Sequence, residues 1–436
     1  MSDILTLILA AGKSTRMKST LSKVLHSVAS RPMVAYVFDL AKQISGKQIY
    51  TIINPELEAL MKQDYSTASH FIIQPEQKGT GHAVKIALDA IDEKTLSHHE
   101  WLLVLYGDAP LLQKETLDRM IEMRDDQTAI ILSTMHVSET NQYGRVIENQ
   151  GKVQKIVEYK DASDAAKSLT LCNGGVMLIK SHFAKKWLAD LKPSSVSGEF
   201  YLTDLVASAV KEGHPVKYCE MPPAELSGVN NRSELAHVES VMQGRLREKV
   251  MLGGATLLDP RSVYFAYDTQ IGKDVLIEPH VFFGPKVKVD DHVHIKAFSH
   301  LENCHLKAAS KIGPFARLRP GTEIGKNSAV GNFVEIKNSK LHRNVKAGHL
   351  SYIGDTEIHD DVNIGAGTIT CNYDGKNKHK TEIETGAFIG SNTALIAPVK
   401  VGKHTLVAAG SVITKPVPDN MLAITRSQQK NMKRKK

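Results

Sequence analysis

Aliphatic residues recur at every sixth position over the second half of the chain, from about residue 262 onward. The first run is Ile271, Ile277, Phe283, Val289, Ile295 and Leu301, and the last is Ile383, Ile389, Leu395, Val401, Val407 and Ile413. Neither the helical period of 3.6 residues nor the strand period of 2 explains this spacing. A six-residue period is typical of a parallel β-helix, in which each short strand points one aliphatic side chain inward. The flat sides of such a solenoid favour stacking with further copies.

The stretch from Ile369 to Glu382, ITCNYDGKNKHKTE, interrupts this repeat. An insertion in a regular solenoid predicts a loop that projects from one face, and such a face is often the binding face.

Residues 1–228 follow a different pattern, in which short apolar runs alternate with amphipathic segments. DILTLILA, QIYTII, HFII, WLLVLY and TAIILST read as strands, whereas PMVAYVFDLAKQI and HAVKIALDAI read as helices. This alternation predicts an α/β domain with a mostly parallel sheet. Ligands then bind at the carboxyl ends of strands, in the loops after Leu9, Ile73 and Leu105. The charged segment 229–254 reads as a linking helix that ends at Gly253-Gly254.

Composition narrows the functional class. The chain has 436 residues and a net charge of +8, which suits polyanionic small substrates such as nucleotides and sugar phosphates. Its aromatic content of 6% and the lack of a binding motif argue against a nucleic-acid partner, and the basic C-terminal run reads as a solvated terminus. The four cysteines form no C-x-x-C pair, and no apolar stretch is long enough to span a membrane. We therefore expect a cytoplasmic protein without membrane insertion.

The four residues Gly12-Lys13-Ser14-Thr15 look like the end of a P-loop. A P-loop also requires a glycine five residues before the Gly-Lys pair, where this chain has Leu7. A P-loop ATPase or GTPase is therefore not the favoured interpretation.

The loops at the strand ends still suit a nucleoside triphosphate. The small residues up to Gly12 leave room for a flat base, and Lys13, Arg16 and Lys23 bring three cations into one neighbourhood. Asp108 follows a wholly apolar strand, where a carboxylate is well placed to bind Mg²⁺. Each feature alone is equally consistent with an ordinary turn or helix cap, and their occurrence on successive strand ends favours a site.

The pattern L-x-A-A-G-x-x-x-R-M, a following lysine, Q-x-E-x-x-G-T and Y-G-D resembles the sugar-phosphate nucleotidylyltransferases. With the long hexapeptide repeat behind it, nearly the whole chain resembles the bacterial bifunctional N-acetylglucosamine-1-phosphate uridylyltransferases and glucosamine-1-phosphate acetyltransferases. The resemblance implies a Rossmann-like nucleotidyltransferase domain (1–228), a helical linker (229–254) and a left-handed β-helix acetyltransferase domain with a basic tail (255–436). It also implies acetyl transfer from acetyl-CoA to glucosamine 1-phosphate, then uridylyl transfer from UTP with release of pyrophosphate, Mg²⁺ as cofactor, and a homotrimer formed through the β-helix.

The same resemblance implies the residues of the uridylyltransferase site. Asp108 and Asn230 match the Mg²⁺ ligands, and the remaining positions match nucleotide and sugar contacts. These contacts are Leu9, Ala10, Ala11, Gly12, Arg16, Lys23, Gln74, Gly79, Thr80, Tyr106, Gly107, Gly144, Glu158 and Asn173.

A second set of polar residues lies in the β-helix half. An arginine and a lysine can hold a sugar phosphate, and Glu335 can bind an amine. A histidine such as His349 is suited to remove a proton near neutral pH. His349 alone is also consistent with an ordinary surface residue. The resemblance implies His349 as general base. It implies substrate contacts from Arg319, Glu335, Lys337, Tyr352 and Asn363, and acetyl-CoA contacts from Ala366, Asn372, Tyr373, Ser391, Ala409 and Arg426.

Three positions depart from the family pattern. Ser14 replaces a usual Gly, Ser22 a usual Pro, and Gly174 a usual Thr that follows Asn173. None of them removes a charge or a metal ligand.

Two rival hypotheses remain at this point: a monofunctional nucleotidylyltransferase whose β-helix only oligomerises, and a non-catalytic regulatory protein. The KAGH, NFVEIK and CNYDG segments argue against the first, and Lys23 and Asp108 argue against the second.

Overall fold

The computed structural model describes residues 3–137 and 141–434, and the chain divides into two compact units, residues 1–242 and 243–436. The boundary falls inside the long helix α9 (Arg232–Leu252), which lies within the segment predicted to link the two domains. Among the described residues, no helix combines the length and apolarity needed to cross a bilayer.

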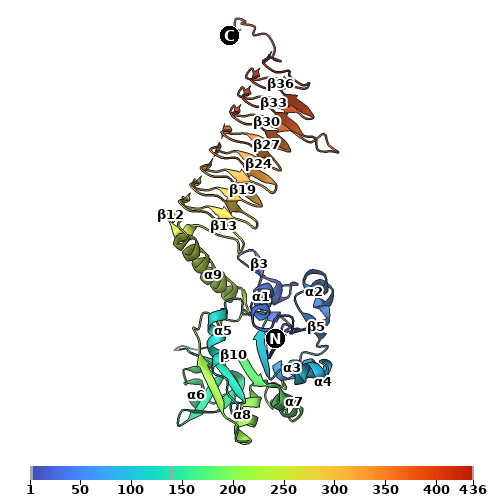
Figure 1. The fold of residues 1–436 in the computed structure, drawn as a ribbon, viewed down its shortest axis with the longest axis vertical. Helices are drawn as coiled ribbons and strands as arrows, with labels where there is room; N and C mark the ends of the chain where they lie inside the picture. The colour runs from blue at the N-terminus through green and yellow to red at the C-terminus, as the bar shows by residue number, and fades with distance from the viewer. Residues whose placement is uncertain (1–2, 138–140, 435–436) are drawn as a thin grey trace. The chain divides into compact units, whose positions relative to one another are not determined.

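The first unit is built on one sheet, of which Figure 1 labels β5 and β10. The strand order is β11-β7-β10-β6-β1-β4-β5, and β8 and β9 extend the sheet beside β10. The pairs β1–β4, β1–β6, β4–β5 and β7–β11 are parallel, as predicted, whereas β10 runs antiparallel to both β6 and β7. The strands are β1 Ile4–Leu9, β4 Ile49–Ile53, β5 His70–Ile73, β6 Trp101–Tyr106, β7 Ile130–His136, β8 Arg145–Asn149, β9 Lys152–Val157, β10 Leu171–Lys180 and β11 Val216–Glu220, with a separate hairpin of β2 Ser27–Val28 and β3 Arg31–Pro32.

Helices cover both faces of this sheet because its central strands are apolar on both sides. Leu5 and Leu7 of β1 face a core that includes α3, α7 and α8, while Ile4 and Ile8 face a core that includes α1 and α5. The helices are α1 Met33–Ser45, α2 Glu58–Tyr65, α3 Thr80–Ala90, α4 Glu93–Ser97, α5 Lys114–Glu122, α6 Asp164–Lys167, α7 Ser181–Ala189 and α8 Asp204–Lys211. Parallel strands covered on both faces are the arrangement predicted from the sequence.

The second unit is a parallel β-helix whose coils stack along one axis (Figure 1). Its first face has the order β12 Thr256–Leu257, β14 Leu276–Ile277, β17 His294–Ile295, β20 Lys311–Ile312, β23 Ala329–Asn332, β26 Lys346–His349, β29 Asn363–Ile364, β32 Phe388–Ile389, β35 Leu406–Val407 and β37 Leu422–Ala423. Its second face has β15 Phe282–Phe283, β18 His300–Leu301, β21 Arg317–Leu318, β24 Glu335–Lys337, β27 Tyr352–Gly354, β30 Ile369–Cys371, β33 Ala394–Ile396 and β36 Val412–Ile413. Its third face has β13 Gln270–Ile271, β16 Lys288–Val289, β19 Cys304–Leu306, β22 Thr322–Ile324, β25 Lys340–Leu341, β28 Thr356–Ile358, β31 Thr381–Ile383 and β34 Val399–Val401.

The six-residue repeat accounts for this unit. The aliphatic side chains that recur at every sixth position point inward and form one continuous buried core, with Ile295, Leu318 and Ile389 among its fully buried members. The predicted left-handed β-helix of hexapeptide repeats is confirmed.

One corner of the coils, between the first and second faces, carries a stack of aromatic rings. Phe298, Phe315 and Phe333 follow one another at ring-centroid distances of 4.9 and 5.1 Å. All three have positive φ angles, between 55° and 58°, a conformation that non-glycine residues adopt infrequently. Stacking between successive coils helps to offset the cost of that conformation.

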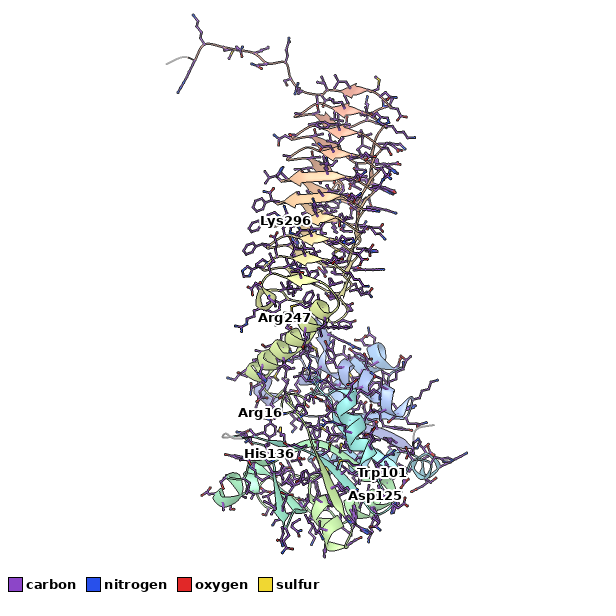
Figure 2. The ribbon with its side chains drawn as sticks, turned by 60° about the vertical axis from the view of Figure 1, so that its left-hand side comes forward. Arg16, Trp101, Asp125, His136, Arg247 and Lys296 are labelled. Carbon is purple, nitrogen blue, oxygen red and sulfur yellow. The ribbon has the colours of Figure 1, made fainter. Side chains whose placement is uncertain are left out.

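The carboxyl end of α9 is attached to the first coils of the second unit. Gln243 exchanges two hydrogen bonds with the backbone of Phe265, and Arg247 donates to the carbonyl of Pro260 at 2.9 Å (Figure 2). Leu246 and Val250 of α9 pack against the apolar core of the coils, so the end of this helix covers the first coils and serves as a cap of the solenoid.

Candidate functional sites

A cavity of about 440 Å³ opens at the carboxyl ends of β1, β5 and β6. This is the edge at which the sequence places a ligand, because the three parallel strands end together there. Residues predicted for the nucleotide form most of its lining: Leu9, Ala10, Ala11, Gly12, Lys23, Gln74, Gly79, Thr80, Tyr106 and Asp108, together with Lys13, Gln77, Ala83 and Glu199.

Lys23, Asp108 and Asn230 meet in this region. The Lys23 ammonium forms an ion pair with the Asp108 carboxylate and donates to Oδ1 of Asn230 at 3.2 Å. The Asp108 carbonyl also accepts a hydrogen bond from the Val229 amide at 3.1 Å, which fixes Asn230 beside the strand end. The fold therefore places the Lys23 ammonium between two accepting oxygens, one from Asp108 and one from Asn230.

Tyr106 links this group to the residues predicted for the sugar. Its hydroxyl is buried, and burial together with the charges of Glu158 and Asp108 raises the pKa of Tyr106 well above its ordinary value. Burial also raises the pKa of Glu158, whose carboxylate accepts a hydrogen bond from Thr203 at 2.8 Å. A buried carboxyl group next to a tyrosine ring is suited to bind hydroxyl groups of a sugar.

The other predicted sugar contacts lie close to Glu158. The backbone N–H of Asn173 donates to the Gly144 carbonyl at 2.8 Å. A Cβ at Gly144 would lie 3.3 Å from Oε2 of Glu158. Gly174 is explained by packing: a Cβ there would collide with Leu226 and with Oγ of Ser133. The threonine that is usual in the family does not fit this backbone unless Leu226 moves.

The start of α3 depends on a glycine. Gly79 has a φ of 107°, and a Cβ on it would overlap the backbone of Phe200. The Phe200 carbonyl in turn accepts a hydrogen bond from the Gly81 amide at 2.9 Å. The segment around Phe200 therefore closes over the first turn of α3, and it brings Glu199 to the cavity.

Arg16 is the predicted triphosphate contact that the structure leaves outside the cavity lining. It lies in the short 3-10 helix η1 (Thr15–Met17), and its side chain is exposed (Figure 2). Ser14, just before it, adopts a left-handed conformation with φ 57°, and its hydroxyl accepts a hydrogen bond from the Lys23 amide at 2.9 Å. Ser14 thus holds the loop against Lys23, which is a role that its P-loop appearance does not suggest.

In the second unit, His349 ends β26 and is exposed at the corner between the first and second faces. Its Nδ1 is hydrogen-bonded to Oδ1 of Asn332, the residue paired with it on β23. An amide oxygen only accepts, so this contact requires the proton on Nδ1, and in the neutral ring Nε2 then has a free lone pair. Sequence reasoning missed Asn332, although its spacing of 17 residues from His349, close to one coil of the solenoid, was a usable signal.

The acetyl-CoA candidates lie along the same corner on the coils that follow. The Gly367 amide donates to the His349 carbonyl at 3.3 Å, next to Ala366, and the carbonyl of Ser391 accepts from Gly410 at 2.8 Å, next to Ala409. Arg426 donates to the Ala409 carbonyl at 2.8 Å. Asn363 lies on β29, the neighbour of β26. The structure thus brings His349, Asn363, Ala366, Ser391, Ala409 and Arg426 to adjacent coils.

A second group lies at the opposite end of the second face. Arg319 donates to Glu335 at 2.8 Å, so that the carboxylate predicted to bind an amine is paired with an arginine. A hydrogen bond with Lys378 and, after it, the positive charge of that lysine lower the pKa of Lys337. Lys378 belongs to the projecting loop and was missed by the sequence analysis. Arg319, Lys337 and Lys378 form a cationic group that suits a phosphate.

Tyr352 and the projecting loop border this cationic group. A Cβ at Gly354 would meet both the Tyr352 hydroxyl and the Asn372 amide, which places these two groups side by side. Asn372 is buried and donates to Asp355, whereas Tyr373 is exposed and donates to the Gly375 carbonyl at 2.7 Å. Among the described residues, no hydrogen bond or ion pair joins His349 to Arg319 or Lys337.

Both units match families of known proteins. Residues 6–229 match a family model described as a MobA-like NTP transferase domain, and residues 380–415 match one described as a hexapeptide repeat of succinyl-transferase. The chain is 46% identical over 431 residues to the bifunctional protein GlmU of Zymomonas mobilis, covering 97% of this chain and 94% of that protein. It belongs to the bifunctional GlmU family. It is also 45% identical over 439 residues to GlmU of Paramagnetospirillum magneticum, covering 99% and 95% of the two chains.

Membership in the GlmU family confirms the activity expected from the sequence. The first unit is a nucleotidyltransferase, the second is a hexapeptide-repeat acyltransferase, and together they make the chain a bifunctional enzyme of UDP-N-acetylglucosamine synthesis.

Proposed function

We propose that the first unit transfers UMP from UTP to N-acetylglucosamine 1-phosphate in the cavity at the carboxyl ends of β1, β5 and β6. The observation that carries this proposal is the meeting of Lys23, Asp108 and Asn230 at the edge of that cavity. The small residues from Leu9 to Gly12 accommodate the base, and Gln74 supplies an amide that can bind to its edge.

The donor atoms fit a magnesium ion. A carboxylate and an amide oxygen converge on one positive charge, the Lys23 ammonium, and Mg²⁺ prefers oxygen ligands of this kind. In the proposal Asp108 and Asn230 hold Mg²⁺, which when bound neutralises charge on the phosphates. Lys23 and Arg16 bind the triphosphate and stabilise the charge that develops at its α-phosphate. No protein nucleophile is required, because an oxygen of the sugar phosphate attacks.

The sugar lies on the side of Tyr106, Glu158 and Asn173 in this proposal. Glu158 accepts hydrogen bonds from sugar hydroxyls, and the lack of a side chain at Gly144 leaves room for the ring beside it. Tyr106 separates the sugar from Asp108, so that the two substrates meet at the phosphates.

In the second unit, His349 is proposed as the general base for acetyl transfer. Because Asn332 accepts from Nδ1, the unprotonated Nε2 is available to take a proton from the glucosamine amine as it attacks the thioester of acetyl-CoA. Arg319, Lys337, Tyr352 and Asn363 bind the sugar phosphate, and Glu335 holds Arg319 in place. Acetyl-CoA lies along the corner formed by Ala366, Ser391, Ala409 and Arg426, with Asn372 and Tyr373 as further contacts.

A homotrimer through the β-helix is part of the proposal. The late coils leave apolar side chains exposed on two faces, with Phe388 and Leu406 on the first face and Ile369 and Val412 on the second, each 47–48% exposed. Large apolar side chains exposed on successive coils are typical of an interface between protein chains. A partner chain would also supply the groups that one chain does not bring to His349. A cytoplasmic location completes the proposal and agrees with the four free cysteines.

Product analysis tests the proposed function. The full-length protein is incubated with glucosamine 1-phosphate, acetyl-CoA, UTP and Mg²⁺, and UDP-N-acetylglucosamine is measured. We expect product from glucosamine 1-phosphate only when acetyl-CoA is present, and we expect product from N-acetylglucosamine 1-phosphate without acetyl-CoA. Product from N-acetylglucosamine 1-phosphate but never from glucosamine 1-phosphate would favour the monofunctional alternative, and no product from either would refute the proposal.

A further inference from the structure

The third face of the β-helix carries a mixed cluster of metal-binding side chains that the two transferase sites do not use. His359 directly follows β28, Glu382 lies in β31, and Glu384 directly follows β31, so that neighbouring coils supply the three residues. One ligand atom from each of them lies within 4.8 Å of the others. Nε2 of His359 is 3.6 Å from Oε1 of Glu382 and 4.0 Å from Oε2 of Glu384.

These separations are too long for hydrogen bonds, which span about 2.7–3.2 Å. They are close to the spacing of two ligands on one ion, since bonds of about 2.0–2.1 Å at a tetrahedral angle separate the ligand atoms by about 3.3 Å. Nε2 of His359 is shielded from solvent and has no hydrogen-bond partner among the described residues. A buried ring nitrogen that faces two carboxylates and bonds to neither has room for an ion between them.

Other histidines on the same face show that this arrangement is particular to His359. His305 contacts Asp290 at 2.8 Å and His342 contacts Glu357 at 3.1 Å, and each of these is a direct hydrogen bond to a single carboxylate. His342 also stacks on His359, with ring centroids 4.9 Å apart and an angle of 10° between the planes. Stacking holds the His359 ring with Nε2 toward the two carboxylates.

Lys400 is the charged group that competes for this position. Its ammonium donates to Glu384 Oε1 at 2.6 Å and to Glu382 Oε1 at 3.2 Å. Oε2 of Glu384 is therefore left to face His359, and the Glu384 carboxylate can bridge the lysine and an ion. The two carboxylates and Lys400 together carry one net negative charge, which favours a divalent cation.

We propose that His359, Glu382 and Glu384 bind a divalent transition-metal ion of the Zn²⁺ type, with water as the remaining ligand. One imidazole and two carboxylates suit such an ion better than Mg²⁺, which prefers oxygen ligands alone. The ion would connect the coil of β28 to that of β31. The projecting loop with Tyr373 and Lys378 leaves the solenoid between these two strands, so the ion would fix the base of that loop beside the acetyltransferase site.

Zn²⁺ titration of the full-length protein tests the proposal. The protein is treated with chelator and dialysed, and Zn²⁺ binding is followed by calorimetry with Mg²⁺ in excess. We expect one Zn²⁺ per chain that persists in Asp108→Ala and whose affinity falls more than ~10-fold in His359→Gln, since even indirect changes at metal sites cost this much. His305→Gln is the matched control, because it removes a histidine from the same face, and it should bind Zn²⁺ as the wild type does.

Two further readouts keep the test decisive. Circular dichroism in chelator establishes that each variant is folded, and Glu384→Gln replaces His359→Gln if the latter is not. Co²⁺ in place of Zn²⁺ should give an intense tetrahedral visible spectrum that is lost in His359→Gln. Equal Zn²⁺ affinity in wild type and in the folded His359→Gln variant would overturn the proposal, and so would Zn²⁺ binding that disappears entirely in Asp108→Ala.

Discussion

The hydrogen bond between Asn332 and His349 gives a prediction with a defined size. Asn332→Ala removes the acceptor that keeps the proton on Nδ1, so part of the His349 population carries its proton on Nε2 and cannot act as a base. A net hydrogen bond contributes about 0.5–1.5 kcal/mol, which corresponds to roughly a 2- to 12-fold loss of kcat for acetyl transfer. His349→Ala removes the base itself and should cost about 10²- to 10⁴-fold.

The variant Asn332→Asp separates positioning of the ring from a merely structural role. A carboxylate still accepts from Nδ1, so much of the activity at high pH should be retained. Its negative charge favours the protonated imidazole, so the acid limb of the profile of kcat/KM against pH should move to higher pH. CoA release is the assay, and pyrophosphate release by the first unit of the same preparation is the internal control. Full acetyl-transfer activity in Asn332→Ala, or an acid limb of Asn332→Asp that moves to lower pH, would refute the reasoning.

Three further predictions concern packing, pH and assembly. Gly79→Ala should lower stability by about 1–3 kcal/mol because it combines a positive φ with overlap on Phe200, and Gly46→Ala, which also has a positive φ but open space around it, should cost less in thermal melts. In the folded state the pKa of Glu158 lies above its ordinary value of 4.5, so the folded state binds more protons than the unfolded state. The free energy of unfolding should therefore fall as the pH rises from about 4.5 to the folded pKa. Glu158→Gln should remove this fall, and a variant whose melting temperature keeps the wild-type dependence on pH would contradict the prediction. Light scattering should give three times the 48.0 kDa of one chain, and a monomer that retains full acetyl-transfer activity would contradict the trimer.

Much of the fold was predictable because the sequence signals are local. A six-residue apolar period can be satisfied by a β-helix and by neither a helix nor a flat sheet, and the apolar runs of β1 and β6 predicted central strands of a covered sheet. The direction of β10 was not predictable. Its apolar residues look the same in either direction, and only its antiparallel pairing with β6 and β7 decides the matter.

The candidate sites were predictable only in part. Asp108 was found because a carboxylate after an apolar strand is conspicuous, but its pairing with Lys23 depends on two loops that the sheet brings together across 85 residues. Asn332 and Lys378 were missed because their roles depend on the stacking of coils, which sets Asn332 against His349 and Lys378 against Lys337. Gly174 appeared as a departure from the family, and its reason is the packing of Leu226, a residue distant in sequence.

The central claim is that one chain carries two independent transferase sites, one in each unit. The most direct measurement follows CoA release and pyrophosphate release separately in Asp108→Ala and in His349→Ala. CoA release is measured with glucosamine 1-phosphate, and pyrophosphate release is measured with UTP and N-acetylglucosamine 1-phosphate. We predict that Asp108→Ala loses pyrophosphate release and keeps CoA release, and that His349→Ala shows the reverse. Loss of both activities in either folded variant, or full retention of pyrophosphate release in Asp108→Ala or of CoA release in His349→Ala, would contradict the account.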